Sequence, residues 1–294
     1  MTPLTNPAGK VYLVGAGPGD PRLLTVKAAA LLRQAGVVLH DDLVPAPILA
    51  LAGPEAMVVN VGKRSGAKKI TQLEINRLMV ESARRGMNVV RLKSGDPAIF
   101  GRLGEEIDAL DAAGVPFEVV PGVTAAVAAA ASVGGSLTDR RKSSQLLIVS
   151  GHRASKSGDA PAGRQVEKIE WRGLVDNGTT IAIYMPGHEF AALRRELLEA
   201  GLDPRTPAVV VSRASTPGQT HARTTLASLH TLARLPAPTI LLIGNCLERV
   251  NRGADLAASG AAAQSTDFAS LASLAQAEAA PNAPERNSER RIHP

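Results

Sequence analysis

Three short turns rich in glycine and proline contain the polar groups that ligand sites use. They cover residues 14–21 (VGAGPGDP), 91–102 (RLKSGDPAIFGR) and 119–126 (VVPGVTAA), and each accompanies an apolar run. Open parallel sheets bind ligands at the edge formed by the carboxyl ends of their strands. The sequence therefore predicts a small-molecule site built from these turns, although each turn alone is equally consistent with an ordinary strand-to-helix connection.

The first turn departs from the dinucleotide-binding fingerprint. That fingerprint requires the spacing G-x-G-x-x-G. Here Gly15 and Gly17 are followed by Asp20 at the third position, and Pro18 has no N–H to donate. A dinucleotide is therefore not expected at this turn.

The second turn offers groups that suit a ribose or an amino-acid moiety, and the third can present a polar group to a ligand. Ser94, Gly95 and Asp96 combine a tight turn with a hydroxyl and a carboxylate. Thr124 lies in the first turn of a predicted helix, where its hydroxyl or backbone N–H can face a ligand. The second turn thus favours a ribose or an amino-acid group over a pyrophosphate.

Charge and composition narrow the class of ligand. The chain has 33 Lys and Arg against 27 Asp and Glu, a formal charge of +6, with a basic cluster at Lys63, Arg64, Lys68 and Lys69. Such a cluster attracts an anion, or is a solvated loop. Aromatic residues make up only 2% of the chain, which disfavours nucleic-acid binding by base stacking. One Cys and six scattered His predict no metal site.

Alternating strands and helices are expected to position the turns. Apolar runs predict strands over residues 11–15, 37–40, 57–62, 88–92, 117–120 and 146–151, and helical patterns predict helices ending near residue 35 and over residues 71–86, 104–113 and 125–133. Thr71 and Glu74 form a predicted capping box. This alternation indicates an α/β protein with a mostly parallel sheet covered on both faces. Beyond residue 178 strands have fewer helices between them, which predicts a smaller mixed α/β domain.

We expect three parts along the chain: an N-terminal α/β domain over residues 1–140, a C-terminal α/β domain over 141–251 and a disordered tail over 252–294. The tail is rich in Ala and has no sustained apolar stripe that could offset its ordering entropy. No run of eighteen apolar residues exists, so no membrane span is expected. The N-terminus has no apolar signal core, which indicates a cytoplasmic location.

Together the motifs resemble one known family. GAGPGDPRLLTVKA, HDDLV, VGKRSG, RLKSGDPAIFGRLGEE, VVPGVTAAVAAAASVGGSLTDRR, SGH, YMPG and SRASTPGQ occur in the order and spacing of the tetrapyrrole methylase family. The resemblance covers residues 9–250 and is greatest to members that methylate uroporphyrinogen III twice to give precorrin-2. It implies a two-domain tetrapyrrole methylase fold with S-adenosylmethionine in the cleft between the domains, no metal, no nucleic-acid partner and a homodimer.

The resemblance also implies roles for individual residues. S-adenosylmethionine, and its product S-adenosylhomocysteine, would contact nine residues: Pro18, Ser94, Gly95, Asp96, Ile99, Thr124, Ala125, Met185 and Ala214. Asp41 would accept a proton and Lys63 would donate one. Arg102 would take part in catalysis and, with Glu105 and Arg140, line the tetrapyrrole side. A substrate with eight carboxylates suits Arg, whose guanidinium binds carboxylates bidentately.

Four places depart from the family pattern, and alternatives stay open. Ser94 stands where the family turn usually has Gly, His40 where Tyr is commoner, and Gly135-Ser136 where Ile-Pro is usual, and Pro186 lengthens the turn after Met185. The alternatives are a methylase of a later corrin intermediate, a cofactor-binding regulator without turnover, and a nucleic-acid methylase of similar fold.

Overall fold

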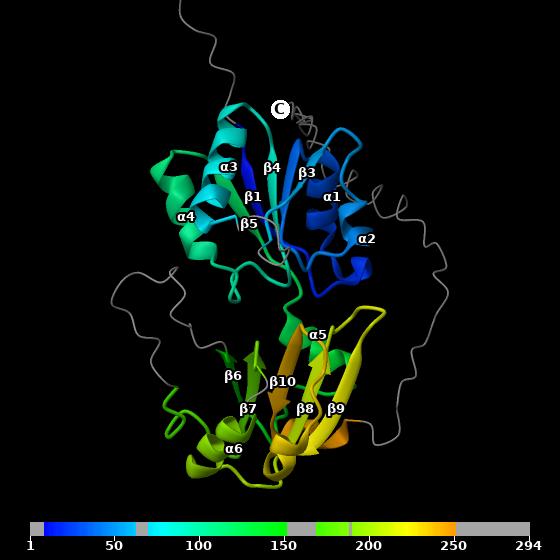
Figure 1. Ribbon diagram of the computed structural model, residues 1–294, viewed down its shortest axis with the longest axis vertical. Coiled ribbons are helices and arrows are strands. Elements are labelled where there is room, and N and C mark those ends of the chain that lie inside the picture. Colours follow the sequence, from blue (N-terminus) through cyan, green and yellow to red (C-terminus); the bar gives the residue numbers. More distant parts are fainter. Residues whose placement is uncertain (1–8, 63–69, 152–168, 188–189, 251–294) are drawn as a thin grey trace, which may run out of the picture. The chain divides into compact units, whose positions relative to one another are not determined.

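The structure, a computed structural model, describes residues 9–62, 70–151, 169–187 and 190–250 (Figure 1). Its first sheet has the strand order β3-β2-β4-β1-β5, and every neighbouring pair is parallel. The predicted parallel sheet is confirmed. The strands are β1 (Val11–Gly15), β2 (Val37–His40), β3 (Met57–Asn60), β4 (Val89–Lys93) and β5 (Phe117–Val120).

Helices cover both faces of the first sheet, as Figure 1 shows. On one face α3 (Gln72–Arg84) and α4 (Leu103–Ala112) pack against Leu13 and Leu39, and on the other α1 (Val26–Gln34) and α2 (Ala46–Leu49) pack against Val14 and Val38. Successive side chains of a strand point to opposite faces, so strands covered on both sides need apolar residues at nearly every position. The capping box of Thr71 and Glu74 at the start of α3 is confirmed.

The central strand β4 is an exception to that rule. Val89 lies in the core against α3, but Arg91 and Lys93, which share its face of the strand, are also buried, with 3% and 2% of their surface exposed. Two cations thus lie in an otherwise apolar layer.

The second sheet is mixed, with the order β6-β7-β10-β8-β9. Its strands are β6 (Gln145–Ser150), β7 (Thr179–Tyr184), β8 (Pro207–Ser212), β9 (Thr220–Thr225) and β10 (Thr239–Ile243). Only β6 and β7 are parallel neighbours; the other neighbouring pairs are antiparallel. The prediction of a mixed second α/β region is confirmed.

The second sheet also has two covered faces. The helix α6 (Phe190–Glu199) and the 3-10 helix η2 (Leu226–Thr231) pack on one face, and α5 (Ala125–Ser132) and the 3-10 helix η3 (Asn245–Arg249) on the other. The short 3-10 helix η1 (Pro21–Leu23) follows β1. The domain limit at residues 140/141 stays a prediction, and the tail predicted over 252–294 lies outside the described residues.

Candidate active site

The turns that follow β1, β4 and β5 pack main chain against main chain. The Gly17 N–H donates to the Gly95 carbonyl at 3.1 Å, and the Gly95 N–H donates back to the Gly17 carbonyl at 2.8 Å. A Cβ added to Gly122 would lie 2.4 Å from the Gly95 carbonyl oxygen, and one added to Gly15 would lie 2.6 Å from the Gly122 nitrogen. Only glycine permits this approach, so the structure brings the three predicted turns together at one sheet edge.

Asp96 holds two of these turns in place. Its carboxylate accepts hydrogen bonds from the N–H of Ala98 at 2.8 Å and of Gly122 at 2.9 Å. The N–H of Ile99 donates to the Asp96 carbonyl at 3.2 Å. The Ser94 hydroxyl is buried without a hydrogen-bond partner among the described residues. A buried polar atom of this kind calls for an explanation, and an absent ligand is one.

The start of α5 is joined to the end of β7 by Tyr184, which the sequence did not single out. The Tyr184 hydroxyl accepts a hydrogen bond from the Ala126 N–H at 2.9 Å and contacts the Thr124 hydroxyl. Its ring lies 5.1 Å from the ring of Phe100, with a tilt of 59°. The structure therefore brings Thr124, Ala125 and Phe100 to the strand end that precedes Met185.

Left-handed backbone conformations occur in the segments that follow β4, β7 and β8. Among the described residues, five that are not glycine have φ between 48° and 62°: Phe100, Arg102, Met185, Arg213 and Ser215. Arg213 and Ser215 flank Ala214, and Met185 is half exposed. Each such residue costs of the order of 1–3 kcal/mol, and strain of this kind concentrates at functional sites. Pro18, half buried in the first turn, completes the predicted cofactor residues.

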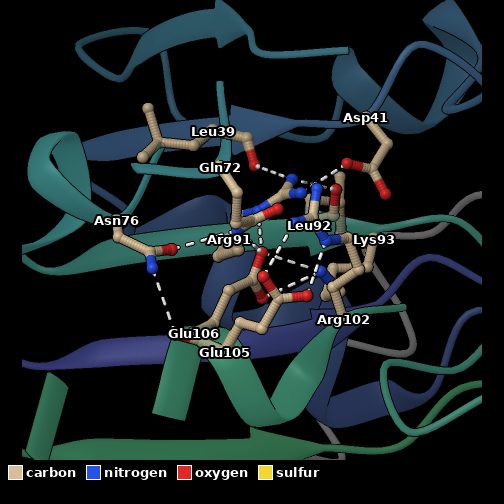
Figure 2. Close-up of polar contacts among 10 residues, drawn as sticks. All are labelled: Leu39, Asp41, Gln72, Asn76, Arg91, Leu92, Lys93, Arg102, Glu105 and Glu106. Carbon is tan, nitrogen blue, oxygen red and sulfur yellow. Dashed lines mark hydrogen bonds and ion pairs between the residues drawn. The ribbon is translucent and has the colours of Figure 1, made fainter. Parts of the chain in front are cut away.

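Asp41 follows β2 and is held by Arg91, as Figure 2 shows. The Arg91 Nη2 donates to Asp41 Oδ1 at 2.5 Å, and the Asp41 N–H donates to the Leu92 carbonyl at 3.0 Å. His40 Nδ1 lies 2.9 Å from the Asp41 carbonyl oxygen, so His40 acts on the main chain of Asp41 and not on its carboxylate. About a third of the Asp41 side chain is exposed.

Behind Asp41 lies a group of charges that the sequence analysis did not identify. Glu106 of α4 is fully buried and accepts from Arg91 Nε at 2.9 Å and from Lys93 Nζ at 2.8 Å with each oxygen. Burial and the charge of Arg91 lower the pKa of Lys93 below its ordinary value of 10.5, despite Glu106. Burial also lowers the pKa of Arg91, but Asp41 and Glu106 outweigh it and leave that pKa raised. Both opposing effects are those expected of ion pairs in an apolar layer.

Arg102 and Glu105 form a bidentate ion pair, with both N···O distances 2.7 Å, at the start of α4. Both side chains are partly exposed, so the carboxylates of a ligand can compete for Arg102. Arg140 is exposed between α5 and β6 and makes no hydrogen bond or ion pair with another described residue, so the structure does not join it to this pair. Lys63 lies outside the described residues.

No group of three or more His, Cys, Asp and Glu residues in the described ranges could hold a metal ion. No helix there is both long and apolar enough to cross a membrane.

The sequence is similar to those of known proteins over most of the part that the structure describes. The sequence model of one protein family, the tetrapyrrole (corrin/porphyrin) methylases, matches residues 10–230 of the chain. The chain is 45% identical over 243 residues to a siroheme synthase of Hahella chejuensis, covering 81% of this chain and 49% of that protein. It is 44% identical over 240 residues to a uroporphyrinogen-III C-methyltransferase of Paracoccus denitrificans, covering 81% of each. The chain thus spans about half the length of the siroheme synthases it matches and most of the length of the Paracoccus enzyme.

Solved structures are similar over the same part of the chain. A uroporphyrin-III C-methyl transferase of Thermus thermophilus, complexed with S-adenosylhomocysteine, superposes with a TM-score of 0.67 at 40% identity, covering 81% of this chain and 99% of that one. A cobalt precorrin-4 methyltransferase superposes with a TM-score of 0.69 at 33% identity, covering 81% and 96%.

Proposed function

This chain belongs to the tetrapyrrole (corrin/porphyrin) methylases, and on that basis we propose that it is an S-adenosylmethionine-dependent C-methyltransferase. Its substrate in this proposal is uroporphyrinogen III, which it methylates twice to give precorrin-2, a precursor of sirohaem and cobalamin. The observation that supports this most is the 44% identity with the Paracoccus enzyme over 81% of both chains.

The residues at the glycine turns fit S-adenosylmethionine. Gly17, Gly95 and Gly122 approach so closely that no side chain fits between these turns, and glycine at these positions leaves the main chain of the turns without Cβ atoms. The Ser94 hydroxyl is buried and unpaired among the described residues, as a polar group beside a missing ligand would be. In this proposal Pro18, Ser94 to Asp96, Ile99, Thr124, Ala125, Met185 and Ala214 hold the cofactor.

When bound, S-adenosylmethionine supplies an electrophilic methyl group on a sulfonium sulfur. The chain's own contribution is to hold a pyrrole carbon in line with that methyl, because positioning supplies much of the acceleration in such a displacement. The methylated ring is then positively charged and must lose a proton. Asp41, with a fixed carboxylate that is one-third exposed, is the proposed acceptor, and Lys63 is the proposed donor. A general base of this kind contributes roughly 10²–10⁴-fold.

Arg102, Glu105 and Arg140 are proposed to bind the substrate's carboxylates and orient the macrocycle. Arg102 already holds one carboxylate bidentately, that of Glu105, which supports a role in carboxylate recognition. We also propose that the chain forms a homodimer. Light scattering on the purified full chain measures its molar mass and so tests this proposal.

A methylase of a later corrin intermediate is the second candidate, because the cobalt precorrin-4 methyltransferase superposes as well as the Thermus enzyme does. The two candidates are separated by single-turnover incubation without oxygen, using S-adenosylmethionine and either uroporphyrinogen III or cobalt-precorrin-4. We expect S-adenosylhomocysteine to form only with uroporphyrinogen III. Formation only with cobalt-precorrin-4 would select the second candidate. Binding of S-adenosylhomocysteine without turnover on either would indicate a regulator.

A further inference from the structure

Three charged side chains of β4 and α4, Arg91, Lys93 and Glu106, are buried in a layer that is otherwise mostly apolar. Arg91, Lys93 and Glu106 lie on the face of the first sheet that α3 and α4 cover with apolar residues. Replacing a buried ion pair by apolar residues of similar size is often neutral or stabilising. A contribution to folding stability therefore does not by itself explain why these charges are buried. The residues that the cluster contacts point to a functional role.

Arg91 uses its guanidinium to reach in two directions. Nε donates to Glu106 at 2.9 Å, while Nη2 donates to Asp41 and Nη1 donates to the Leu39 carbonyl at 3.2 Å (Figure 2). The planar fork fixes the angle between these partners, which a lysine ammonium cannot do. Arg91 thus links a fully buried carboxylate to a carboxylate that is partly exposed.

Asp41 is fixed at its main chain and at one side-chain oxygen. Its N–H is bonded to Leu92, its carbonyl contacts His40, and Oδ1 is bonded to Arg91. Oδ2 makes no hydrogen bond with any residue in the described ranges. Oδ1 therefore fixes the orientation of the carboxylate, and Oδ2 can accept a proton from a substrate.

The same cluster also packs against the turn that leads into α4, which ends at Arg102. A Cβ added to Gly101 would come within 3.0 Å of Lys93 Cε, so this turn lies directly on the Lys93 side chain. From α3, Asn76 Nδ2 donates to the Glu105 carbonyl at 3.0 Å (Figure 2). The cluster thus contacts Asp41 directly and packs against Gly101, the residue before Arg102.

We propose that Arg91, held from behind by Glu106 and Lys93, is a positioning residue that aims the Asp41 carboxylate at the substrate. This inference rests on the proposed function, in which Asp41 accepts the proton. Arg91 does not touch the reacting atoms. Its effect on kcat therefore depends on the presence of the Asp41 carboxylate, whereas the effect of a residue that only stabilises the fold would not.

A double-mutant cycle on the purified full chain measures the dependence. Arg91→Met in the otherwise native chain should lower kcat by about 10- to 100-fold, because it removes a charge-assisted hydrogen bond. KM for uroporphyrinogen III and the Kd for S-adenosylhomocysteine should stay within about threefold. In a chain that already carries Asp41→Asn, adding Arg91→Met should change kcat by less than about twofold. Arg84→Met, which removes an exposed Arg bonded to the Ala113 carbonyl, is the matched control and should leave kcat unchanged.

Several results would overturn the inference. If the two kcat losses multiply in the double variant, Arg91 does not act through Asp41. The same conclusion follows if Arg91→Met raises KM or weakens cofactor binding while kcat is unchanged. If Arg91→Met does not fold, Arg91→Lys takes its place in the cycle: it retains the charge without the fork and should lose kcat partially.

Failure of the proposed function is distinguishable from failure of this inference. If the native chain does not methylate uroporphyrinogen III, the function is wrong and the inference falls with it. If the native chain is active and Asp41→Asn retains its kcat, the function stands and the role of Asp41, with that of Arg91, is wrong.

Discussion

Replacing Glu106 by glutamine tests the energetics of the buried charges on β4. The side chain is fully buried and accepts three N–H···O contacts of 2.8–2.9 Å from Arg91 and Lys93. Removing one partner of a buried ion pair costs about 3–5 kcal/mol, because it leaves the other charge buried and uncompensated. Glutamine keeps the volume and one acceptor oxygen, so we expect a loss of about 3 kcal/mol in the free energy of unfolding.

The loss is measured by urea denaturation followed by far-ultraviolet circular dichroism. The fluorescence of Trp171 is unsuitable, since this single tryptophan packs in the core of the second sheet. With a denaturant slope of about 3 kcal/mol/M, the midpoint should fall by about 1 M. Glu81→Gln is the matched control: its carboxylate is exposed and pairs with Arg77 at 3.4 Å on α3, so its loss should be below about 0.5 kcal/mol.

A second substitution identifies the cause of that loss. Arg91 keeps its ion pair with Asp41 in Glu106→Gln, whereas Lys93 loses its carboxylate partner. Adding Lys93→Met removes that uncompensated cation and should restore part of the stability. Because burial already lowers the pKa of Lys93, the recovery should be smaller at pH 10 than at pH 7, where the lysine is more fully charged. Stability of Glu106→Gln within 0.5 kcal/mol of the native chain, or no recovery with Lys93→Met, would refute the reasoning.

Three further predictions concern other parts of the described chain. Tyr184→Phe removes the hydroxyl that accepts from the first turn of α5 and should cost about 1–3 kcal/mol in urea denaturation; an unchanged midpoint contradicts it. Gly122→Ala places a Cβ 2.4 Å from a carbonyl oxygen of the neighbouring turn and should weaken S-adenosylhomocysteine binding at least about tenfold in calorimetry, whereas Gly104→Ala, with open space at its Cβ, should not. Side-chain and backbone hydrogen bonds from Arg205 lower the pKa of Asp203 from 3.8 to about 2, so this carboxylate stabilises the fold above pH 4 and loses that effect as the pH falls through 2. Arg205→Ala removes the guanidinium but keeps the backbone N–H, so it should return the pKa of Asp203 part of the way toward 3.8 in a carbon-13 NMR titration. An unchanged value would show that the Arg205 side chain is not the cause.

The glycine turns could be predicted because their geometry is local. A buried strand followed by Gly15 and Gly17, or by Gly95, already indicates a tight turn at a sheet edge, and parallel strands place such turns side by side. The structure confirms the parallel sheet and shows these turns in contact. The roles assigned to the turns in cofactor binding remain predictions.

The buried charges could not be predicted from the sequence pattern. Arg91 and Lys93 alternate with apolar residues, which in a single strand is equally typical of a solvent-facing side. Glu106 is fifteen residues from Arg91, and only the packing of α4 on the sheet brings the two together. An Arg on the central strand of a sheet that is covered on both faces indicates a buried charge. The sequence alone did not show that β4 is the central strand, so Arg91 could not be recognised as buried.

Strand β9 was not predicted either, and for a related reason. Its sequence THARTT is polar, because β9 lies at the edge of the second sheet and pairs only with β8. Edge strands are often polar and give no apolar run to detect. Tyr184 was included only as part of a motif, since its hydrogen bonds to the start of α5 join segments 58 residues apart.

The most direct test of the central claim is to follow the methyl group itself. The full chain is incubated without oxygen with uroporphyrinogen III and S-adenosylmethionine carrying a carbon-13 methyl, and the product is examined by mass spectrometry and NMR. We predict two labelled methyl groups per macrocycle, both bonded to ring carbon, and a turnover that Asp41→Asn strongly reduces. An unlabelled macrocycle, or label found only on carboxylate oxygen, would contradict the proposed C-methyltransferase.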